Sequence, residues 1–177
     1  MPDSLNVQVN SVLDSPVISR IRRNHGLEHA TLHILSERNP RLSVAGHSNT
    51  RGFWILGEVT NEELQSAVQE ALLRLQNGEQ KLAVHPNCGT NIVTAGVFAG
   101  AAGALAMFRS GSRLRDKLGR IPMAATLATL ALILAQPLGL LLQERVTTSG
   151  IPGSLEVVEI IQTKKGRMTA HRVVTKG

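Results

Sequence analysis

The chain has 177 residues and a formal net charge of +6, and 42% of its residues are hydrophobic. Aromatic residues make up 2% and tyrosine is absent, which excludes the stacking platform used to bind single-stranded nucleic acid, so no nucleic-acid partner is expected. The single cysteine, Cys88, excludes an internal disulfide.

The N-terminal part predicts a flexible segment followed by a helix. Residues 1–14 are polar and are expected to be loose. The stretch SPVISRIRRNHGLEHATLHILSERNP then predicts a helix, because Ser15 suits the N-cap, Pro16 suits the first helical position, and Asn39-Pro40 ends the pattern.

A second helix is predicted over residues 60–78. Thr60 and Glu63 have the spacing of a capping box, an apolar stripe follows at helical period, and Gly78 is expected to act as the C-cap. Short strands are expected on both sides of this helix, at residues 41–48, 52–59 and 81–84.

Two long uncharged segments follow. Residues 82–108 and 121–143 contain no Asp, Glu, Lys or Arg, and Ile92–Phe108 and Ile121–Leu142 within them are dominated by small and aliphatic residues. A helix needs ~20 apolar residues to cross a bilayer, with ~17 as the lower limit. Two buried helices of a soluble domain are the alternative, but so small a soluble part could hardly cover them. The sequence therefore predicts two transmembrane helices, with the lipid bilayer as partner.

The orientation of the two spans stays open. Five basic residues lie in the connection 109–120, where they suit anionic headgroups, and Lys81 and Arg145 supply one each on the other side. This asymmetry places the connection in the cytoplasm and both termini outside. The N-terminus, however, has no signal-peptide pattern.

The C-terminal part predicts a β-hairpin. Residues 154–163 and 168–176 flank the turn KKGR. In the first of these strands, Val157, Glu159 and Ile161 are expected on one face of the sheet, and Val158, Ile160 and Gln162 on the other. The expected fold class is α+β, and four parts are predicted: a flexible N-terminus at 1–14, an α/β head at 15–90, a transmembrane hairpin at 91–143, and a tail at 144–177 that packs on the head.

The stretch NHGLEHATLH, residues 24–33, carries the first candidate metal ligands. His25 and His29 lie one helical turn apart, so both imidazoles can reach one cation. Glu28 lies between them, where it can polarise a metal-bound water or act as a general base. His33, a further turn on, offers another imidazole.

A second candidate cluster lies in HPNCGTN, residues 85–91. His85 and Cys88 have the two-residue spacer common among zinc-binding Cys and His ligands. A Zn²⁺ site with His25, His29, His85 and Cys88 would be structural, because its four positions are filled. A site that leaves one position to water, with Glu28 beside it, would be catalytic.

The motif HGLEH has the form H-x-x-E-H and resembles the inverzincin metallopeptidases. That resemblance implies His25 and His29 as ligands and Glu28 as the catalytic base. Those enzymes take a downstream glutamate as third ligand, for which the candidates are Glu58, Glu62, Glu63 and Glu70. Over roughly residues 20–145, the pattern NHGLEHAT…HPNCGTN also resembles a family of small two-span bacterial membrane proteins, which implies that both histidine stretches belong to one unit.

Other polar and small residues have simpler interpretations. His47 and His171 are expected to be solvated or hydrogen-bonded, and Cys88 alone suits a small packing position. In the first span, Gly96, Gly100 and Gly103 form a close-packing pattern that predicts helix pairing with the second span, with another copy of the chain or with another membrane protein.

Two functions follow from these patterns. The first is a membrane-anchored zinc-dependent peptidase or hydrolase with Glu28 as its base. The alternative is a non-catalytic membrane subunit or assembly factor of a larger complex, in which any metal only fastens the head to the hairpin.

Overall fold

The computed structural model describes residues 11–108, 110–111, 113–165 and 168–177. The chain divides into two compact units. The head unit comprises Met1–His85 and Glu144–Gly177, and the hairpin unit comprises Pro86–Gln143. Most of the flexible N-terminus predicted at 1–14 lies outside the described residues.

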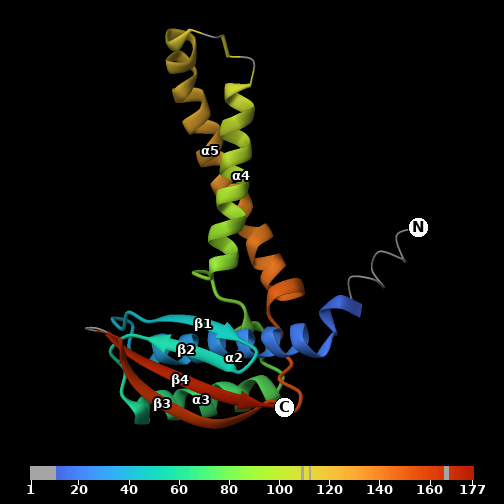
Figure 1. The fold of residues 1–177 in the computed structure, drawn as a ribbon, viewed down its shortest axis with the longest axis vertical. Coiled ribbons are helices and arrows are strands. Elements are labelled where there is room, and N and C mark those ends of the chain that lie inside the picture. The colour runs from blue at the N-terminus through green and yellow to red at the C-terminus, as the bar shows by residue number, and fades with distance from the viewer. Residues whose placement is uncertain (1–10, 109, 112, 166–167) are drawn as a thin grey trace. The chain divides into compact units, whose positions relative to one another are not determined.

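The head unit is a four-stranded antiparallel sheet with two helices on one face (Figure 1). The strand order is β1-β2-β4-β3, so the C-terminal hairpin joins the sheet through β4, which pairs with β2. The fold is thus α+β with a C-terminal β-hairpin, as predicted. The strands are β1 (Ala45–Asn49), β2 (Gly52–Leu56), β3 (Glu156–Lys165) and β4 (Met168–Lys176).

The two head helices form where the local sequence predicts them. Helix α2 (Pro16–Arg38) begins with its proline, although the Ser15 side chain makes no capping hydrogen bond. Helix α3 (Asn61–Gln76) has the expected reciprocal capping box between Thr60 and Glu63. Asn77 is its C-cap, and Gly78 follows with a φ of +92°, a conformation that favours glycine.

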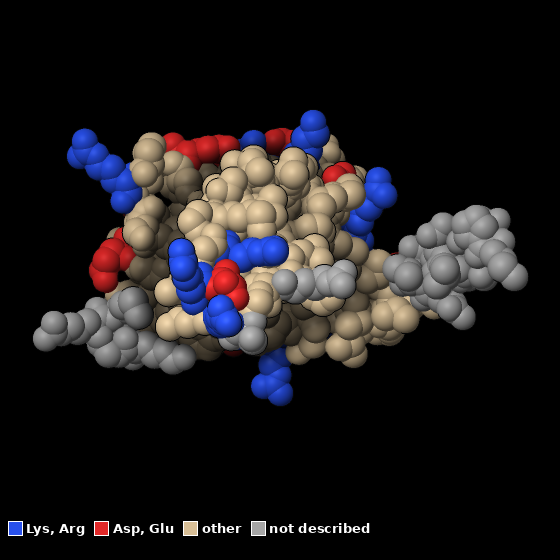
Figure 2. Space-filling view, turned by 90° about the horizontal axis from the view of Figure 1, so that it is seen from above, with Lys and Arg blue, Asp and Glu red and all other residues tan. Residues whose placement is uncertain are grey.

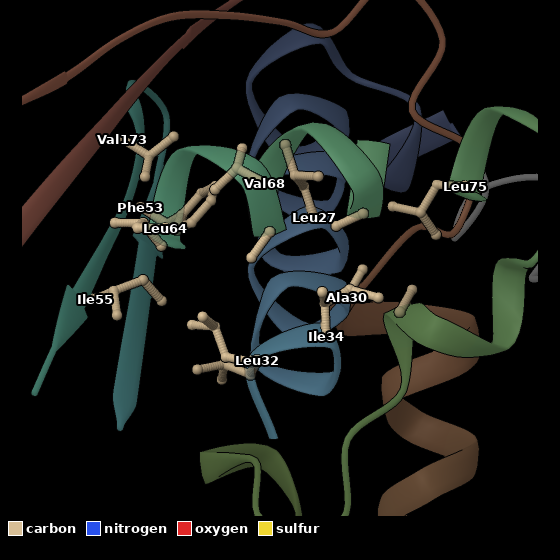
Figure 3. Packing of buried hydrophobic residues seen from close by; sticks show 14 of the residues in the cluster. Leu27, Ala30, Leu32, Ile34, Phe53, Ile55, Leu64, Val68, Leu75 and Val173 are labelled. Atoms are coloured by element: carbon tan, nitrogen blue, oxygen red, sulfur yellow. The ribbon is translucent and has the colours of Figure 1, made fainter. Parts of the chain in front are cut away.

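The head core lies between the sheet and these helices. The inward-facing Phe53, Ile55 and Val173 are fully buried. They pack against side chains of both helices, Leu27 and Leu64 among them, which Figure 3 shows gathered in one cluster. This burial explains why β2 is nearly all apolar, whereas the edge strand β1 is not.

Two sequence predictions in the head were wrong. Residues 81–84 form no strand, because η1 (Gln80–Ala83) is a 3₁₀ turn. The carbonyls of its last residue, Ala83, and of the next residue, Val84, bond to histidines instead of to a neighbouring strand. The simple alternation predicted for β3 is also broken, because the register with β4 shifts between Val157 and Glu159. Val157 and Ile160 therefore both pack against the core.

The hairpin unit consists of α4 (Gly89–Met107) and α5 (Leu114–Leu142), followed by a π-helical turn, η2 (Gln143–Thr147). Both helices are long and apolar enough to cross a membrane. Helix α5 begins earlier than predicted, so part of the basic connection 109–120 is helical. Figure 2, which views the molecule from above, shows charged side chains gathered at this end of the hairpin.

The two long helices approach each other closely at Gly139. A Cβ at this position would overlap Asn91, whose side chain also accepts a 2.6 Å hydrogen bond from Gln143 Nε2. The glycines of the predicted close-packing pattern do not take part in this contact between α4 and α5. No described residue lies within 4 Å of where a Cβ of Gly96, Gly100 or Gly103 would sit, so these glycines do not pair α4 with α5.

In the head, Gly26 permits a close contact of α2 with the chain that returns from the hairpin. A Cβ on Gly26 would overlap the carbonyl oxygen of Ser149 and would lie 3.2 Å from Ala83 Cβ. Ser149 also donates its main-chain N–H to Arg22 O at 2.9 Å. The segment after the hairpin therefore lies directly on α2.

We expect Gly26→Ala to lower the free energy of unfolding of the head by about 1–3 kcal/mol, because the added methyl group forces the two main chains apart. Urea unfolding followed by fluorescence of Trp54, the only tryptophan, measures this effect. Gly119→Ala is the matched helical control, since nothing described lies within 4 Å of its Cβ, and it should leave the Trp54 midpoint unchanged. Equal midpoints for Gly26→Ala and the wild type would contradict the close contact.

Candidate metal centre

Three histidines follow one face of α2 at four-residue intervals. His25, His29 and His33 lie one turn apart in succession, as the sequence predicts for a helix. The ring centroids of His25 and His29 are 4.4 Å apart, and each ring has a nitrogen within 4.8 Å of the other. His29 is 2% exposed, so its ring is packed inside the protein.

Each of these histidines bonds to a main-chain carbonyl of the chain next to the hairpin. His25 Nδ1 lies 2.9 Å from Thr147 O, His29 Nδ1 lies 2.8 Å from Ala83 O, and His33 Nε2 lies 2.9 Å from Val84 O. Because a carbonyl oxygen only accepts, the bonded ring nitrogen carries the proton. In the neutral ring the lone pair is then on Nε2 of His25 and His29 and on Nδ1 of His33.

His85 joins this row from the chain that follows η1. Its ring centroid lies 5.7 Å from that of His29 and 4.9 Å from that of His33. Burial, and secondarily the nearby His33, lower the pKa of His85. The neutral form, which is the form that binds metals, is therefore favoured. Three predicted residues, His25, His29 and His85, thus lie in one row, and His33 belongs to it as well.

Glu28 lies on the side of α2 that faces β1. It is 3% exposed, and its carboxylate lies against Gly46, where a Cβ would overlap it. Gly46 thus provides the space for this side chain. The local sequence around Gly46 does not signal this role, because the need for a small residue arises only when β1 packs against α2.

Cys88 belongs to the hairpin unit and is the N-cap of α4. Its Sγ accepts a 3.4 Å hydrogen bond from the Thr90 N–H. It follows His85 by three residues in the chain.

Two of the four acidic candidates for a third ligand are engaged elsewhere. Glu63 bonds to the N–H and hydroxyl of Thr60 in the capping box, and the main-chain bond is the larger cause of the lowered pKa of its carboxyl. Glu70 forms a 2.6 Å ion pair with Arg38. Both carboxylates therefore have structural roles at the surface of the helices.

The two remaining histidines have different environments. His47 is exposed on β1, as expected. The interpretation of His171 as solvated or hydrogen-bonded was wrong. This residue is 0% exposed in β4, and neither ring nitrogen has a hydrogen-bond partner among the described residues. The register explains its burial, because His171 pairs with Ile55 on one side and Gln162 on the other.

Two comparisons with known proteins found a match. A family model with the description "Domain of unknown function (DUF6391)" matches residues 20–160 of this chain. An uncharacterized protein of Picosynechococcus sp. is 37% identical over 150 residues, covering 79% of this chain and 71% of that protein. No solved structure matches the chain.

Burial of His171 predicts a loss of stability in acid. Desolvation lowers the pKa of its folded-state imidazole below the unfolded value of 6.5. The unfolded chain therefore binds the proton first, so the stabilisation is complete above pH 6.5 and is lost as the pH falls toward the folded-state pKa. We expect His171→Leu to reduce the slope of the unfolding free energy against pH in this window by up to ~1.4 kcal/mol per pH unit.

Urea unfolding of EDTA-treated protein between about pH 5 and about pH 7.5, an interval that includes the ordinary histidine pKa, measures this slope. His47→Leu is the matched control, because His47 is exposed and its replacement should leave the slope unchanged. If His171→Leu has the same slope of unfolding free energy against pH as the wild type, the His171 ring takes up its proton equally in the folded and unfolded chains. That result would contradict the prediction.

Proposed function

We propose that this chain, which belongs to the DUF6391 family, is a membrane-anchored metal-binding protein with a divalent cation held at His25 and His29. One observation carries the proposal: both rings donate Nδ1–H to main-chain carbonyls, which orients the opposite nitrogens as ligands. Metal-bound histidines characteristically use the second nitrogen in this way.

We assign the remaining ligands to His85 and Cys88. His85 is favoured because it lies in the same row as His29 and because burial lowers its pKa, which favours the neutral ring. Cys88 follows by three residues, so its Cα can lie no more than about 11 Å from that of His85. Imidazole and thiolate donors in a four-coordinate set suit Zn²⁺.

Membrane anchoring is supported by exposure of the two long helices. In each helix, the most apolar stretch of 18 residues is only 11% buried. The core helices of a soluble protein would be mostly buried. The basic connection suits the cytoplasmic side, by the charge rule. Gly96, Gly100 and Gly103 remain the proposed face for a second copy of the chain or another membrane protein, since nothing described fills the space beside them.

Two uses of the metal are supported by different contacts. A structural role is favoured because the histidines bond to Ala83 and Thr147, on the two sides of the hairpin in the chain. A hydrolytic role is favoured by Glu28, a buried carboxylate that precedes His29 and has the position of the base in H-x-x-E-H. A catalytic centre would keep one ligand position for water and use Glu28 to take its proton.

We expect the 177-residue chain, purified in non-ionic detergent, to contain one divalent ion per chain by elemental analysis. His25→Ala and His29→Ala should each lose it, because two helical imidazoles form the core of the site. His47→Ala is the control and should keep the ion. Equal metal content in His29→Ala and His47→Ala would refute the assignment, as would a wild-type protein that binds no metal after zinc loading.

Glu28→Gln distinguishes the two uses of the metal. The variant should keep the ion, since Glu28 is not a proposed ligand. If Glu28 is a base, cleavage of membrane-proximal peptides by the loaded enzyme should fall by ~10²–10⁴-fold. A wild-type protein that holds zinc but cleaves no such peptide would leave the non-catalytic membrane subunit as the function.

A further inference from the structure

The histidine row on α2 continues toward solvent beyond the two core ligands proposed above. His29 is 2% exposed, whereas His33, one turn further along the helix, is only half-buried. The next position on the same face is Glu37, whose side chain is 57% exposed. A cation that approaches this end of the row therefore meets Glu37 and His33 before it reaches His29.

The charges beyond His33 favour the approach of a cation. Glu37 Oε2 lies 3.2 Å from Arg74 Nη1, and Arg74 also forms ion pairs with Glu70 and Glu79. Glu70 pairs in addition with Arg38. This surface cluster thus holds more carboxylates than guanidiniums, so its net charge is negative.

The other end of the row is less open to a cation. Arg22, three residues before His25, donates from Nη2 to Arg145 O at 3.0 Å. Its own main-chain carbonyl accepts the Ser149 N–H at 2.9 Å. Because His25 also bonds to Thr147 O, the chain after the hairpin lies over this end of the row. The positive charge of Arg22 opposes a cation there, which leaves the His33 end as the more favourable entrance.

His85 links the solvent end of the row to its buried part. The half-buried His85 ring has its centroid 4.9 Å from that of His33 and 5.7 Å from that of His29. Two imidazoles on one tetrahedral zinc ion, with Zn–N bonds of about 2.0–2.1 Å, have centroids about 5 Å apart. Both separations are near this value, so His85 can share a cation with either neighbour.

The hydrogen bond of His33 prepares its ring for a cation. His33 Nε2 donates to Val84 O at 2.9 Å, which places the proton on Nε2 and the lone pair on Nδ1. The same bond fixes the residue that directly precedes His85. The ring therefore has the tautomer of a metal ligand before any metal arrives, and no proton has to leave when a cation binds.

We infer that His33 and His85 form an outer site that first takes up the divalent cation and passes it to the inner site at His25 and His29. This inference rests on the metal binding proposed above. Two imidazoles hold a cation less tightly than a four-ligand set, so the inner site retains the ion at equilibrium. During transfer, His85 keeps its bond to the cation while the bond from His33 breaks and the bond from His29 forms.

The test measures the rates at which the cation enters and leaves. The 177-residue chain in non-ionic detergent is stripped with EDTA and kept at low ionic strength, where surface charges are least screened. Co²⁺ is the probe, because it accepts imidazole and thiolate ligands as Zn²⁺ does and absorbs visible light when bound. Mixing Co²⁺ with the stripped chain gives the rate of loading, and excess EDTA added to the loaded chain gives the rate of release.

We expect His33→Ala to load Co²⁺ about tenfold more slowly than the wild type, because a site at the entrance raises the local concentration of the cation. Release should slow by the same factor and the final cobalt content should not change, since an entry path acts equally in both directions. A merely structural role of His33 would instead weaken binding and speed release.

Two further variants and the wild type complete the test. His33→Gln keeps an N–H for Val84 O but lacks the imidazole, so it should load as slowly as His33→Ala. His47→Ala removes an exposed histidine outside the row and should load at the wild-type rate. Unchanged loading by His33→Ala, or wild-type loading by His33→Gln, would overturn the outer site and leave the proposed metal binding intact. A wild-type chain that takes up no Co²⁺ would overturn both.

Discussion

Close approach of main chain to main chain at Gly26 is the constraint on which the rest of the head depends. Because residue 26 has no side chain, the Ser149 carbonyl can lie on the surface of α2. That contact brings Thr147 O within 2.9 Å of His25 Nδ1. One turn further along the helix, His29 fixes Ala83 O at 2.8 Å. Segments far apart in the sequence are thus attached to adjacent turns of one helix.

These hydrogen bonds link the structural role of the histidines to the metal binding proposed for them. The bond from His29 to Ala83 O fixes the chain after η1, and it also fixes which ring nitrogen carries the proton. A ring that fastens the chain is therefore already in the tautomer and orientation that a metal ligand needs. Loss of the ring would affect both roles, which is why metal content and stability have to be measured on the same variants.

The features predictable from sequence are those determined by neighbouring residues. Pro16 marks the start of α2, and the Thr60–Glu63 pair marks the start of α3, because capping involves residues within one turn. The uncharged segments predict α4 and α5 by composition alone. In the candidate site, the spacing of His25 and His29 already predicts their proximity, since an α-helix places residues four apart on one face.

The features that sequence analysis missed depend on distant partners. Residues 81–84 are not a strand because His29 and His33 occupy the carbonyls at Ala83 and Val84. His171 is buried because β4 lies between β2 and β3, a position that the local sequence of the C-terminal hairpin does not determine. The space for Glu28 likewise depends on Gly46 in another element.

Polar contacts, more than hydrophobic packing, position β1 against α2. Asn24 is fully buried and donates from Nδ2 to Asn49 O at 2.8 Å, while its Oδ1 accepts from the Thr175 hydroxyl at 2.7 Å. One turn along the helix, Glu28 occupies the space above Gly46. Hydrogen bonds are directional and apolar contacts are not, so this arrangement fixes how far along α2 the strand lies. The position of Glu28 relative to the histidine row therefore follows from the same contacts that hold the short edge strand in place.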